Sequence, residues 1–398
     1  MSRRLEPVTA GAVAAVVGFA STFAVVLQGL RAVGADRDQA ASGLTALCIT
    51  MGVTAILIGV RTRIPVSIAW STPGAALLVS AGHVDGGYRA ALGAFLLTGV
   101  LIVLAGFWGG LARAIAAIPP AIAAAMLAGV LLPLCVAPVH AMDQRPWLTA
   151  PVVATWLVLL RVARPWAVPG ALGVAIVAIV IDHAPHLGPT SGLFPHLAAS
   201  SPTLTAGSVI GLAVPLFVVT MASQNVPGMT VLQSFGYRPR LRPLLLGTGA
   251  ATAVGAPFGA HAVNLAAITA ALCAGPHAGA DPSRRWIASV SAGVTYLVLG
   301  LAAGVATAFV AASPVVVIEA VAGLALLGAL GAALATAAAD ETLREPTVVT
   351  FAVSASGVAA LGVSSAFWGL VAGLALAWIL PRERPRPIEA EAPAEAAA

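Results

Sequence analysis

The chain has 398 residues, of which 59% are hydrophobic and only 9% are charged, with a formal net charge of +5 and a mean hydropathy of +0.97. A soluble domain carries about 25% charged residues because water must wet its surface, so this composition excludes a soluble protein and indicates one surrounded by lipid. All twenty basic residues are arginines. They are too scattered for a nucleic-acid surface, and the absence of lysine excludes a Walker A motif and a Schiff-base lysine.

Apolar runs of about twenty residues are long enough to cross a bilayer, and the sequence predicts an all-α polytopic membrane protein with about fourteen transmembrane segments. Two of them, the third and the tenth, are interrupted by Pro and Gly near their starts. In chain order the expected segments are 8–30, 40–60, 66–82, 90–112, 119–139, 149–163, 167–182, 205–232, 241–256, 257–275, 286–310, 314–337, 346–362 and 364–380.

The arginines test this topology. With both termini in the cytoplasm, sixteen of the twenty arginines fall on the cytoplasmic side. Only Arg31, Arg37, Arg89 and Arg145 fall on the opposite side. This asymmetry is what the positive-inside rule predicts, so we expect a multi-pass protein of the bacterial inner membrane with both termini inside.

Similar patterns recur about 194 residues apart. Pro120 stands nine residues before Gly129, and Pro314 stands nine residues before Gly323. Two tandem copies of seven segments must insert with opposite orientations, because seven is odd, which predicts an inverted repeat. We expect a first repeat at 1–182, an inter-repeat loop at 183–204, a second repeat at 205–380 and a disordered tail at 381–398.

The third and tenth segments carry the strongest functional signal. The third contains Ser71-Thr72-Pro73-Gly74, and the tenth contains Pro257-Phe258-Gly259-Ala260-His261. Each is expected to be an extended stretch followed by a half-helix, because Pro favours the first helical turn. A broken helix is tolerated in a bilayer only beside protein or a cavity. We expect the two helix N-termini to point at one another near the midplane and to attract an anion.

Polar residues also interrupt the eighth segment, at Ser223-Gln224-Asn225. Such groups are costly in an apolar run unless they find partners. For Gln224 and Asn225 we favour substrate contact over interhelical hydrogen bonding. For Gln28, at the corresponding place in the first segment, we favour the reverse.

These motifs resemble the benzoate:proton symporter (BenE) family over nearly the whole chain, from about Gly11 to Leu380. The resemblance implies the seven-plus-seven inverted-repeat fold of uracil and sulfate permeases. It also implies a core domain (segments 1–4 and 8–11) that moves against a gate domain (segments 5–7 and 12–14), with substrate between the third and tenth segments. The resembling motifs are Trp70-Ser-Thr-Pro-Gly-Ala-Ala-Leu-Leu, Ala123-Ala-Ala-Met-Leu-Ala-Gly, Val219-Thr-Met-Ala-Ser-Gln-Asn-Val-Pro-Gly and Asn264-Leu-Ala-Ala-Ile-Thr-Ala-Ala.

Nucleobase carriers of that fold bind substrate with two Glu side chains, which align with His261 and, less firmly, with Gln224 here. Both replacements can donate hydrogen bonds, whereas a Glu would repel a carboxylate substrate. Phe258 and Trp70 offer faces for an aromatic ring. The expected substrate-binding residues are Ser71, Thr72, Gly74, Gln224, Asn225, Phe258, Gly259, Ala260, His261 and Asn264.

A proton carrier must change its charge within the membrane. The acidic residues within apolar segments are Glu319 and Asp182, and an intramembrane carboxylate is a functional candidate. Glu319 is expected near the outer end of a gate segment. His261 is the stronger candidate because imidazole titrates near neutral pH, with a structural histidine as the alternative.

We therefore expect a proton-coupled importer of an aromatic carboxylate, benzoate by resemblance. The partners are benzoate, protons and membrane lipid, with a homodimer as the oligomeric form to test and no nucleic acid. No cofactor or metal is expected, because Cys48, Cys135 and Cys273 lie far apart and the histidines of 183–203 lack a ligand spacing. The alternatives are a carrier of another small anion or nucleobase-like compound on the same fold, an uncoupled channel, and a membrane enzyme. The sequence shows no nucleophile–base pair, which argues against the enzyme.

Overall fold

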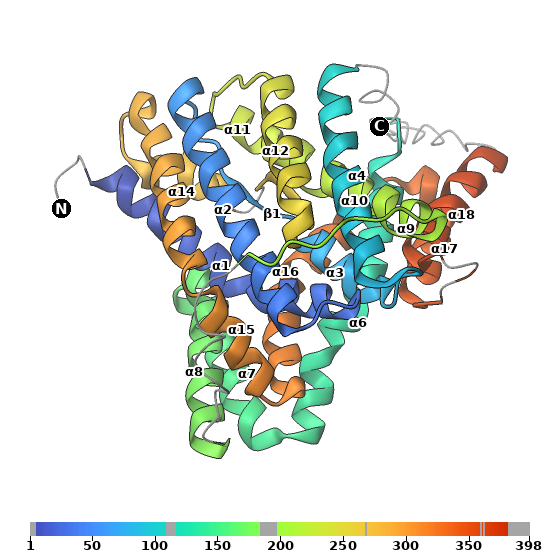
Figure 1. Ribbon diagram of the computed structural model, residues 1–398, viewed down its shortest axis with the longest axis horizontal. Coiled ribbons are helices and arrows are strands. Elements are labelled where there is room, and N and C mark those ends of the chain that lie inside the picture. Colours follow the sequence, from blue (N-terminus) through green and yellow to red (C-terminus); the bar gives the residue numbers. More distant parts are fainter. Residues whose placement is uncertain are drawn as a thin grey trace, which may run out of the picture.

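The structure is a computed structural model that describes residues 5–108, 117–183, 197–266, 269–358, 360 and 363–380. Helices dominate it (Figure 1). The elements of the first half are α1 (Glu6–Ala32), α2 (Arg37–Thr62), β1 (Ile68–Trp70), α3 (Thr72–Ala81), α4 (Gly87–Phe107), α6 (Pro120–Gln144), α7 (Pro146–Val162), the 3-10 turn η1 (Arg164–Trp166) and α8 (Ala167–His183).

The second half also contains long helices and one short strand. Its long helices are α12 (Leu241–Gly255), α14 (Trp286–Gly300), α15 (Ala303–Ala312), α16 (Val315–Ala338), α17 (Arg344–Ala355) and α18 (Ser365–Ile379). Its shorter elements are α9 (Ala206–Ser208), η3 (Val209–Ala213), α10 (Val214–Thr220), η4 (Met221–Asn225), α11 (Val226–Ser234), η5 (Ala256–Phe258), β2 (Val263–Leu265), α13 (Ala270–Ala274), η6 (Pro276–Ala278), η7 (Pro282–Arg284) and η8 (Glu341–Leu343).

Length and hydropathy make this a multi-pass membrane protein. Within the described residues, seven helices are long and apolar enough to cross a bilayer, or up to eight if the bent pair α14–α15 forms one span. Three shorter apolar helices are α3, α7 and α18. At least one helix overlaps each of the expected ranges, although the count of fourteen crossings stays a prediction. The range 286–310 was expected to be one helix, but it bends by 55° between α14 and α15, where Leu301 and Ala302 donate to carbonyls three residues back.

Local signals explain several helix ends. Asp36 caps α2 by accepting from Gln39 N at 2.8 Å, while Gln39 Oε1 accepts from Asp36 N at 3.0 Å. This reciprocal capping box satisfies two donors that the first turn leaves free. The same helix packs closely on α14, since a Cβ at Gly52 would lie 2.7 Å from Gly293 O.

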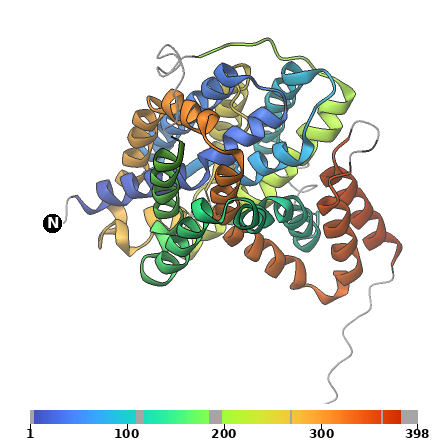
Figure 2. The same ribbon diagram turned by 90° about the horizontal axis from the view of Figure 1, so that it is seen from below.

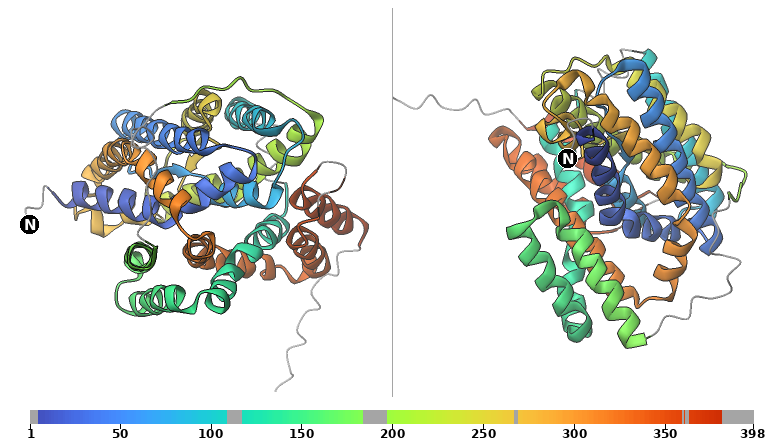
Figure 3. Two further views of the ribbon diagram at one scale, coloured as in Figure 1. Left: turned by 60° about the horizontal axis from the view of Figure 1, so that its bottom comes forward. Right: turned by 90° about the vertical axis from the view of Figure 1, so that its left-hand side faces the viewer.

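The helices pack in two groups. In the first group α14 packs on α1 and α2, and α12 packs on α4 and α2, around the strands. In the second group α16 packs along α6, α17 packs on α18 and α6, and α7 pairs with α8. The α7–α8 pair projects at one side of the molecule, and α17 and α18 lie together at another (Figures 1 and 3).

A two-stranded antiparallel sheet lies inside the first group. Its register pairs Ile68 with Leu265, Ala69 with Asn264 and Trp70 with Val263. Further backbone bonds continue the ladder at both ends, from Ser71 N to Ala262 O (3.0 Å) and from Ala266 N to Ser67 O (2.9 Å). All backbone polar groups in a bilayer need partners, and here the two broken segments supply them to one another.

Residues 197–205 cross the molecule as an extended strap (Figures 1 and 2). Ala198 N donates to Ser42 Oγ at 2.9 Å, and Ser200 N donates to Pro257 O at 2.9 Å. Thr203 N donates to the backbone oxygen of Arg89 at 2.9 Å. The inter-repeat loop was expected to be solvated along its length. This part of it is instead bonded to the helix ends, whereas His186 and His196 lie outside the described residues.

Candidate functional site

Ser71 is the centre of the buried polar contacts around the sheet. It is fully buried and precedes α3, where its Oγ accepts from Gly74 N at 3.0 Å. The hydroxyl of Thr220, on α10, donates to the same oxygen at 3.1 Å. The Ser71 carbonyl accepts from Ala75 N at 2.8 Å. Ser71 therefore positions α3 against α10, because its hydroxyl oxygen accepts a hydrogen bond from each of these two helices.

His261 contacts the same carbonyl from the second broken segment. Its Nε2 lies 3.0 Å from Ser71 O, and since a carbonyl only accepts, Nε2 must carry the hydrogen. The ring is fully buried and presents an edge to Phe95, with 6.3 Å between ring centres. Its Nδ1 atom has no hydrogen-bond partner among the described residues. In the neutral ring this atom is a bare acceptor, and in the protonated ring it is a donor.

The expected position of His261 in a helix is wrong. Gly259 has a φ of +97°, which ends η5, and residues 260–262 are non-helical before β2. The second half-helix, α13, begins only at Ala270. The chain stays extended after Gly259 because residues 262–266 bond to the other broken segment.

The two helix starts also do not face one another. The hydroxyl of Thr269, the residue that precedes α13, lies 2.7 Å from Ser67 Oγ. The start of α3 is instead at Ser71, four residues farther along the first broken segment, or about 13 Å at 3.3 Å per residue. Antiparallel pairing sends the two helices away from opposite ends of the ladder. His261 therefore belongs to the start of α3 alone.

Gly74 and Gly259, which are among the expected substrate-binding residues, are closely surrounded by other protein atoms. A Cβ at Gly74 would lie 2.6 Å from Leu216 Cδ1 and 2.8 Å from Ser71 Oγ. A Cβ at Gly259 would lie 2.5 Å from the Tyr88 hydroxyl and 2.9 Å from Gly43 Cα. Both glycines serve close packing of protein against protein.

Three further candidates are occupied by the fold. Asn225 Oδ1 accepts from Leu265 N at 3.0 Å, and its Nδ2 lies 3.2 Å from the Met221 sulfur. Asn264 is fully buried in β2, with an amide placed to donate to Leu265 O at 2.9 Å and to accept from Ser71 N at 3.1 Å. Ala260 N donates to Gly255 O at 3.1 Å. These residues hold the second strand in place, so the reading of Asn225 as a substrate contact is not supported.

Thr72 and Gln224 keep free hydrogen-bonding groups. Both side chains are partly exposed, and no described residue bonds to them or to Thr72 N. Thr72 begins α3, and Gln224 lies in η4, which packs against β2 and α6. Because α3 also packs on α6, these groups lie where the two helix groups meet.

Gln28 was expected to bond to a neighbouring helix, and it does not. Its amide nitrogen and oxygen are both buried with no partner among the described residues. The next residue, Gly29, packs on α3, since a Cβ there would lie 2.6 Å from Ala75 O. An unpaired amide in an apolar setting costs about 1–3 kcal/mol. This unpaired amide within α1 makes Gln28 a functional candidate that sequence reasoning set aside.

The two aromatic candidates, Trp70 and Phe258, differ in burial. Trp70 is buried, its Nε1 donates to Thr22 Oγ1 at 2.8 Å, and its ring lies 5.7 Å from that of Phe19. Its indole is therefore occupied by α1. Phe258 is partly exposed, and its carbonyl accepts from Ser42 Oγ at 2.9 Å.

The acidic candidates lie on helices of the second group. Glu319 is partly exposed on α16, in the second helix group, and makes no hydrogen bond or ion pair with the described residues. Asp182 is exposed near the end of α8.

Sequence reasoning passed over Tyr88 and Thr220. The Tyr88 hydroxyl is buried without a partner among the described residues and stands against Gly259. The hydroxyl of Thr220 bonds to Ser71. Each is a polar side chain within an apolar run, and that is the only signal that could have identified it.

Two π-type turns, η3 and η4, also escaped prediction. Pro215 lies two residues after η3, and Pro227 lies two residues after η4. A proline has no N–H, so neither can donate the hydrogen bond that an α-helix would form to the carbonyl four residues earlier. The carbonyl of Gly211, which would have bonded to Pro215 N, accepts from Ser364 Oγ at 2.7 Å instead. This bond joins η3 to the residue that precedes α18.

The chain is similar to known membrane transport proteins. The family model described as benzoate membrane transport protein (BenE) matches residues 2–379. The inner membrane protein YdcO of Escherichia coli is 40% identical over 366 residues, which cover 92% of this chain and 93% of that protein. The benzoate membrane transport protein of Acinetobacter baylyi is 29% identical over 381 residues, covering 94% and 95%.

Two solved structures have a similar fold. The transmembrane domain of the cyanobacterial bicarbonate transporter BicA matches with a TM-score of 0.60 at 14% identity, covering 94% of this chain and 98% of that one. SLC26A9 matches with a TM-score of 0.62 at 13% identity, covering 93% and 64%. These likenesses establish the fold, and the family match over nearly the whole chain establishes that the protein is a membrane transporter belonging to the BenE benzoate membrane transport family.

Proposed function

We propose that this chain is a proton-coupled secondary transporter that imports benzoate or a similar aromatic carboxylate across the bacterial inner membrane by alternating access. The observation that carries the proposal is the buried His261 ring, whose Nε2 is committed to Ser71 O while its Nδ1 has no partner. The family name and the relative named as a benzoate transport protein supply the substrate class.

The fixed tautomer links proton to substrate. A carboxylate only accepts hydrogen bonds, so it bonds to Nδ1 only when that atom carries a hydrogen. A buried imidazolium without a counter-charge and a buried carboxylate without one are each costly, and together they neutralise one another. If benzoic acid enters with its own proton, the bound state contains the same number of protons and carboxylates. In either case one proton accompanies one carboxylate.

The remaining free groups suit an anion. Thr72 offers its N–H and hydroxyl, and Gln224 offers its amide, at the junction of the two helix groups. The expected substrate-binding set contains no acidic side chain, so nothing in it repels a carboxylate. Gln28 is a further donor in this proposal, and Phe258 is the proposed contact for the ring.

The architecture in this proposal is two inverted repeats of seven segments with both termini in the cytoplasm. The antiparallel pairing of one broken segment from each half of the chain supports it. The first helix group would be the core domain and the second the gate domain. Rocking of one against the other would expose Thr72 and Gln224 to each side in turn.

The test is counterflow of labelled benzoate in proteoliposomes with and without a pH gradient. Benzoic acid crosses lipid unaided, so protein-free liposomes set the background at each pH. We expect saturable counterflow without a gradient, net accumulation on the alkaline side with one, and competition by benzoate but not by uracil or sulfate. Non-saturable flux would identify a channel, and competition by uracil or sulfate would identify another substrate class.

A further inference from the structure

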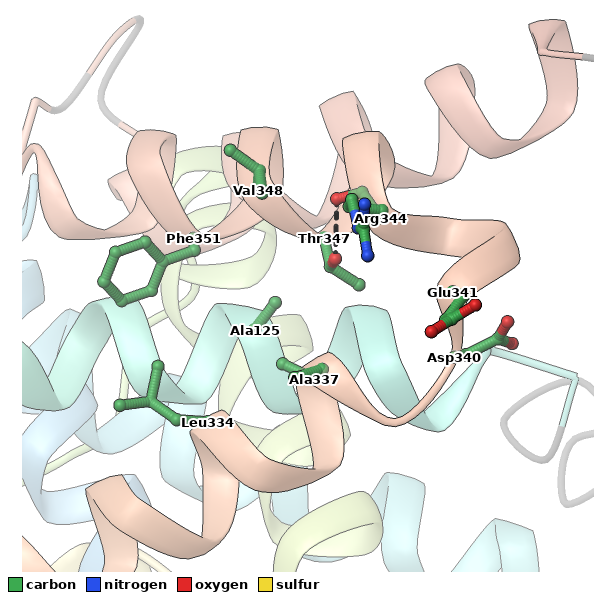
Figure 4. A pocket seen from close by; sticks show the side chains of 10 residues that line it. Ala125, Leu334, Ala337, Asp340, Glu341, Arg344, Thr347, Val348 and Phe351 are labelled. Carbon is green, nitrogen blue, oxygen red and sulfur yellow. Dashed lines mark hydrogen bonds between the residues drawn. The ribbon is translucent and has the colours of Figure 1, made fainter.

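A cavity lies at the ends of three helices in the second group, and Ser71 and His261 are not among the residues that line it. It has a volume of about 270 Å³ between the first turns of α6, the last turns of α16 and the start of α17 (Figure 4). Its lining residues are Ala125, Leu334, Ala337, Ala338, Asp340, Glu341, Arg344, Thr347, Val348 and Phe351. The arginine distribution assigns this end of the helices to the cytoplasmic face.

The cavity changes from apolar to charged along its length. Figure 4 shows Leu334 and Phe351 at one end and Asp340 and Glu341 at the other, with Arg344 between them. Phe351 is seven residues beyond Arg344, or about 10 Å deeper along α17 at 1.5 Å per residue. The charged end coincides with the turn that joins α16 to α17, and the apolar end lies within the spans. Such a gradient matches an amphipathic ligand at a membrane interface.

Two of the three charged side chains that line the cavity form no hydrogen bond or ion pair with the described residues. Asp340 is committed to the turn, since its Oδ1 accepts from Thr342 N at 3.0 Å and from Thr342 Oγ1 at 2.6 Å. Glu341 and Arg344 are exposed, and neither side chain forms an ion pair or hydrogen bond with the described residues. Glu341 lies in η8 and Arg344 begins α17, and both line the cavity. The cavity therefore offers one free carboxylate and one free guanidinium side by side.

We propose that this cavity binds the headgroup of a zwitterionic aminophospholipid, phosphatidylethanolamine. The guanidinium of Arg344 takes the phosphate, for which its planar fork is suited. The carboxylate of Glu341 takes the ammonium, whose three N–H groups are donors. A volume of about 270 Å³ holds the headgroup alone, and the acyl chains then run over Leu334 and Val348, which are 43% and 60% exposed.

The same charges discriminate among lipids. An anionic phosphatidylglycerol has a phosphate for Arg344, but it offers Glu341 only neutral hydroxyl donors and its net negative charge is repelled by that carboxylate. Phosphatidylcholine has the right net charge, but its quaternary ammonium has no N–H to donate to Glu341. Phosphatidylethanolamine alone of the three satisfies both side chains.

The test titrates the purified, delipidated full chain with these three lipids, matched in acyl chains. Native mass spectrometry counts bound lipid, and the shift of the thermal unfolding midpoint reports affinity. We expect half-saturation with phosphatidylethanolamine at about tenfold lower lipid than with the other two, the size of one charge-assisted hydrogen bond. Glu341→Gln should abolish the preference over phosphatidylcholine, and Arg344→Gln should weaken all three lipids about tenfold.

Two controls match these variants. Glu345→Gln and Arg240→Gln neutralise exposed charges outside the cavity, and both should keep the wild-type ranking. All four exchanges are on exposed side chains, so folding is not at stake. Equal responses to the three lipids, or an unchanged ranking in both cavity variants, would overturn the proposal. A shift of the same size with glycerophosphoethanolamine, which has no acyl chains, would identify a soluble phosphate ester as the ligand and would also overturn it.

Discussion

His261 and Ser71 meet across the two broken segments, with Nε2 of the ring donating to the Ser71 carbonyl over 3.0 Å. The residues stand 190 positions apart in the chain. This bond fixes which ring nitrogen carries the hydrogen at neutral charge and leaves Nδ1 as the atom that can gain or lose a proton. The proton-coupling role proposed for His261 follows from that asymmetry.

The first prediction concerns His261→Gln. The amide nitrogen can keep the bond to Ser71 O, while the amide oxygen takes the place of Nδ1 and does not titrate. We expect benzoate counterflow to persist at a reduced rate, with loss of the stimulation by acid and of accumulation against a gradient. His140→Gln, at an exposed position on α6, is the control. Accumulation with an unchanged pH profile would exclude His261 as the carrier and make Glu319→Gln the next variant to measure.

Gln224→Glu should impair uptake through charge. The new carboxylate at position 224 would lie near the proposed position of the substrate's carboxylate, and the two negative charges repel one another. We expect this repulsion to weaken benzoate binding by about tenfold or more. Gln224→Met removes the amide without adding charge and should be less damaging. Gln233→Glu places the same charge at an exposed position of α11. Half-saturating benzoate concentrations measure the effect, and equal values for Gln224→Glu and Gln233→Glu would remove Gln224 from the site.

Gln28→Leu should separate stability from transport. Leucine removes two buried polar atoms that have no partner among the described residues, so we expect the free energy of unfolding to rise by about 1–3 kcal/mol. Uptake should fall, because a proposed substrate donor is lost. Gln144→Leu, at an exposed position, should change neither quantity. A lowered unfolding temperature in Gln28→Leu would show that the amide is paired within the protein.

Gly259→Ala tests the packing reading of that glycine. The added Cβ meets the Tyr88 hydroxyl and the Gly43 backbone at a φ of +97°, whereas Gly236, with φ of +84°, has open space around it. Gly236→Ala should cost about 1–2 kcal/mol for backbone strain alone. Gly259→Ala should cost about 1–3 kcal/mol more through overpacking. The loss of stability should appear as a lower yield of folded protein. A normal yield together with a raised half-saturating benzoate concentration would instead show that Gly259 lines the substrate site.

Arg285 should contribute far more to the free energy of unfolding than its neighbour Arg284. It is 7% exposed, and its guanidinium donates to Ala274 O and Gly279 O, each at 2.8 Å. These bonds tie the end of α13 to the turn before α14. Arg285→Met leaves both carbonyls without their donor and should lower the free energy of unfolding by about 2–4 kcal/mol. Arg284→Met, at an exposed position, should change it little in the same thermal denaturation experiment.

Local chemistry explains which parts of this fold were predictable. The apolar runs located the helices because a bilayer demands length and hydropathy from each span. Pro73 predicted the start of α3 because a Pro in the first helical turn acts locally, and the structure adds Ser71 as its cap. These signals need no distant partner.

The errors lie where a distant partner decides the structure. Residues 260–265 are as apolar as a helix, and they become extended because Ile68 to Trp70 pair with them. The use of Asn225 by Leu265 N depends on that pairing. The sequence therefore identified the two broken segments that pair with one another, but not which of their side chains keep free hydrogen-bonding groups.

The pairing of β1 with β2 also has a consequence for biosynthesis. Ile68 leaves the ribosome 197 residues before its partner Leu265, the difference of the two residue numbers. Throughout that interval the first strand is in the membrane or the translocon without its own backbone partners, which hydrocarbon does not supply. A nascent chain halted before residue 263 thus has the first broken segment but not its ladder. Assembly of the transport site is for that reason a late event, completed only when most of the polypeptide has been inserted.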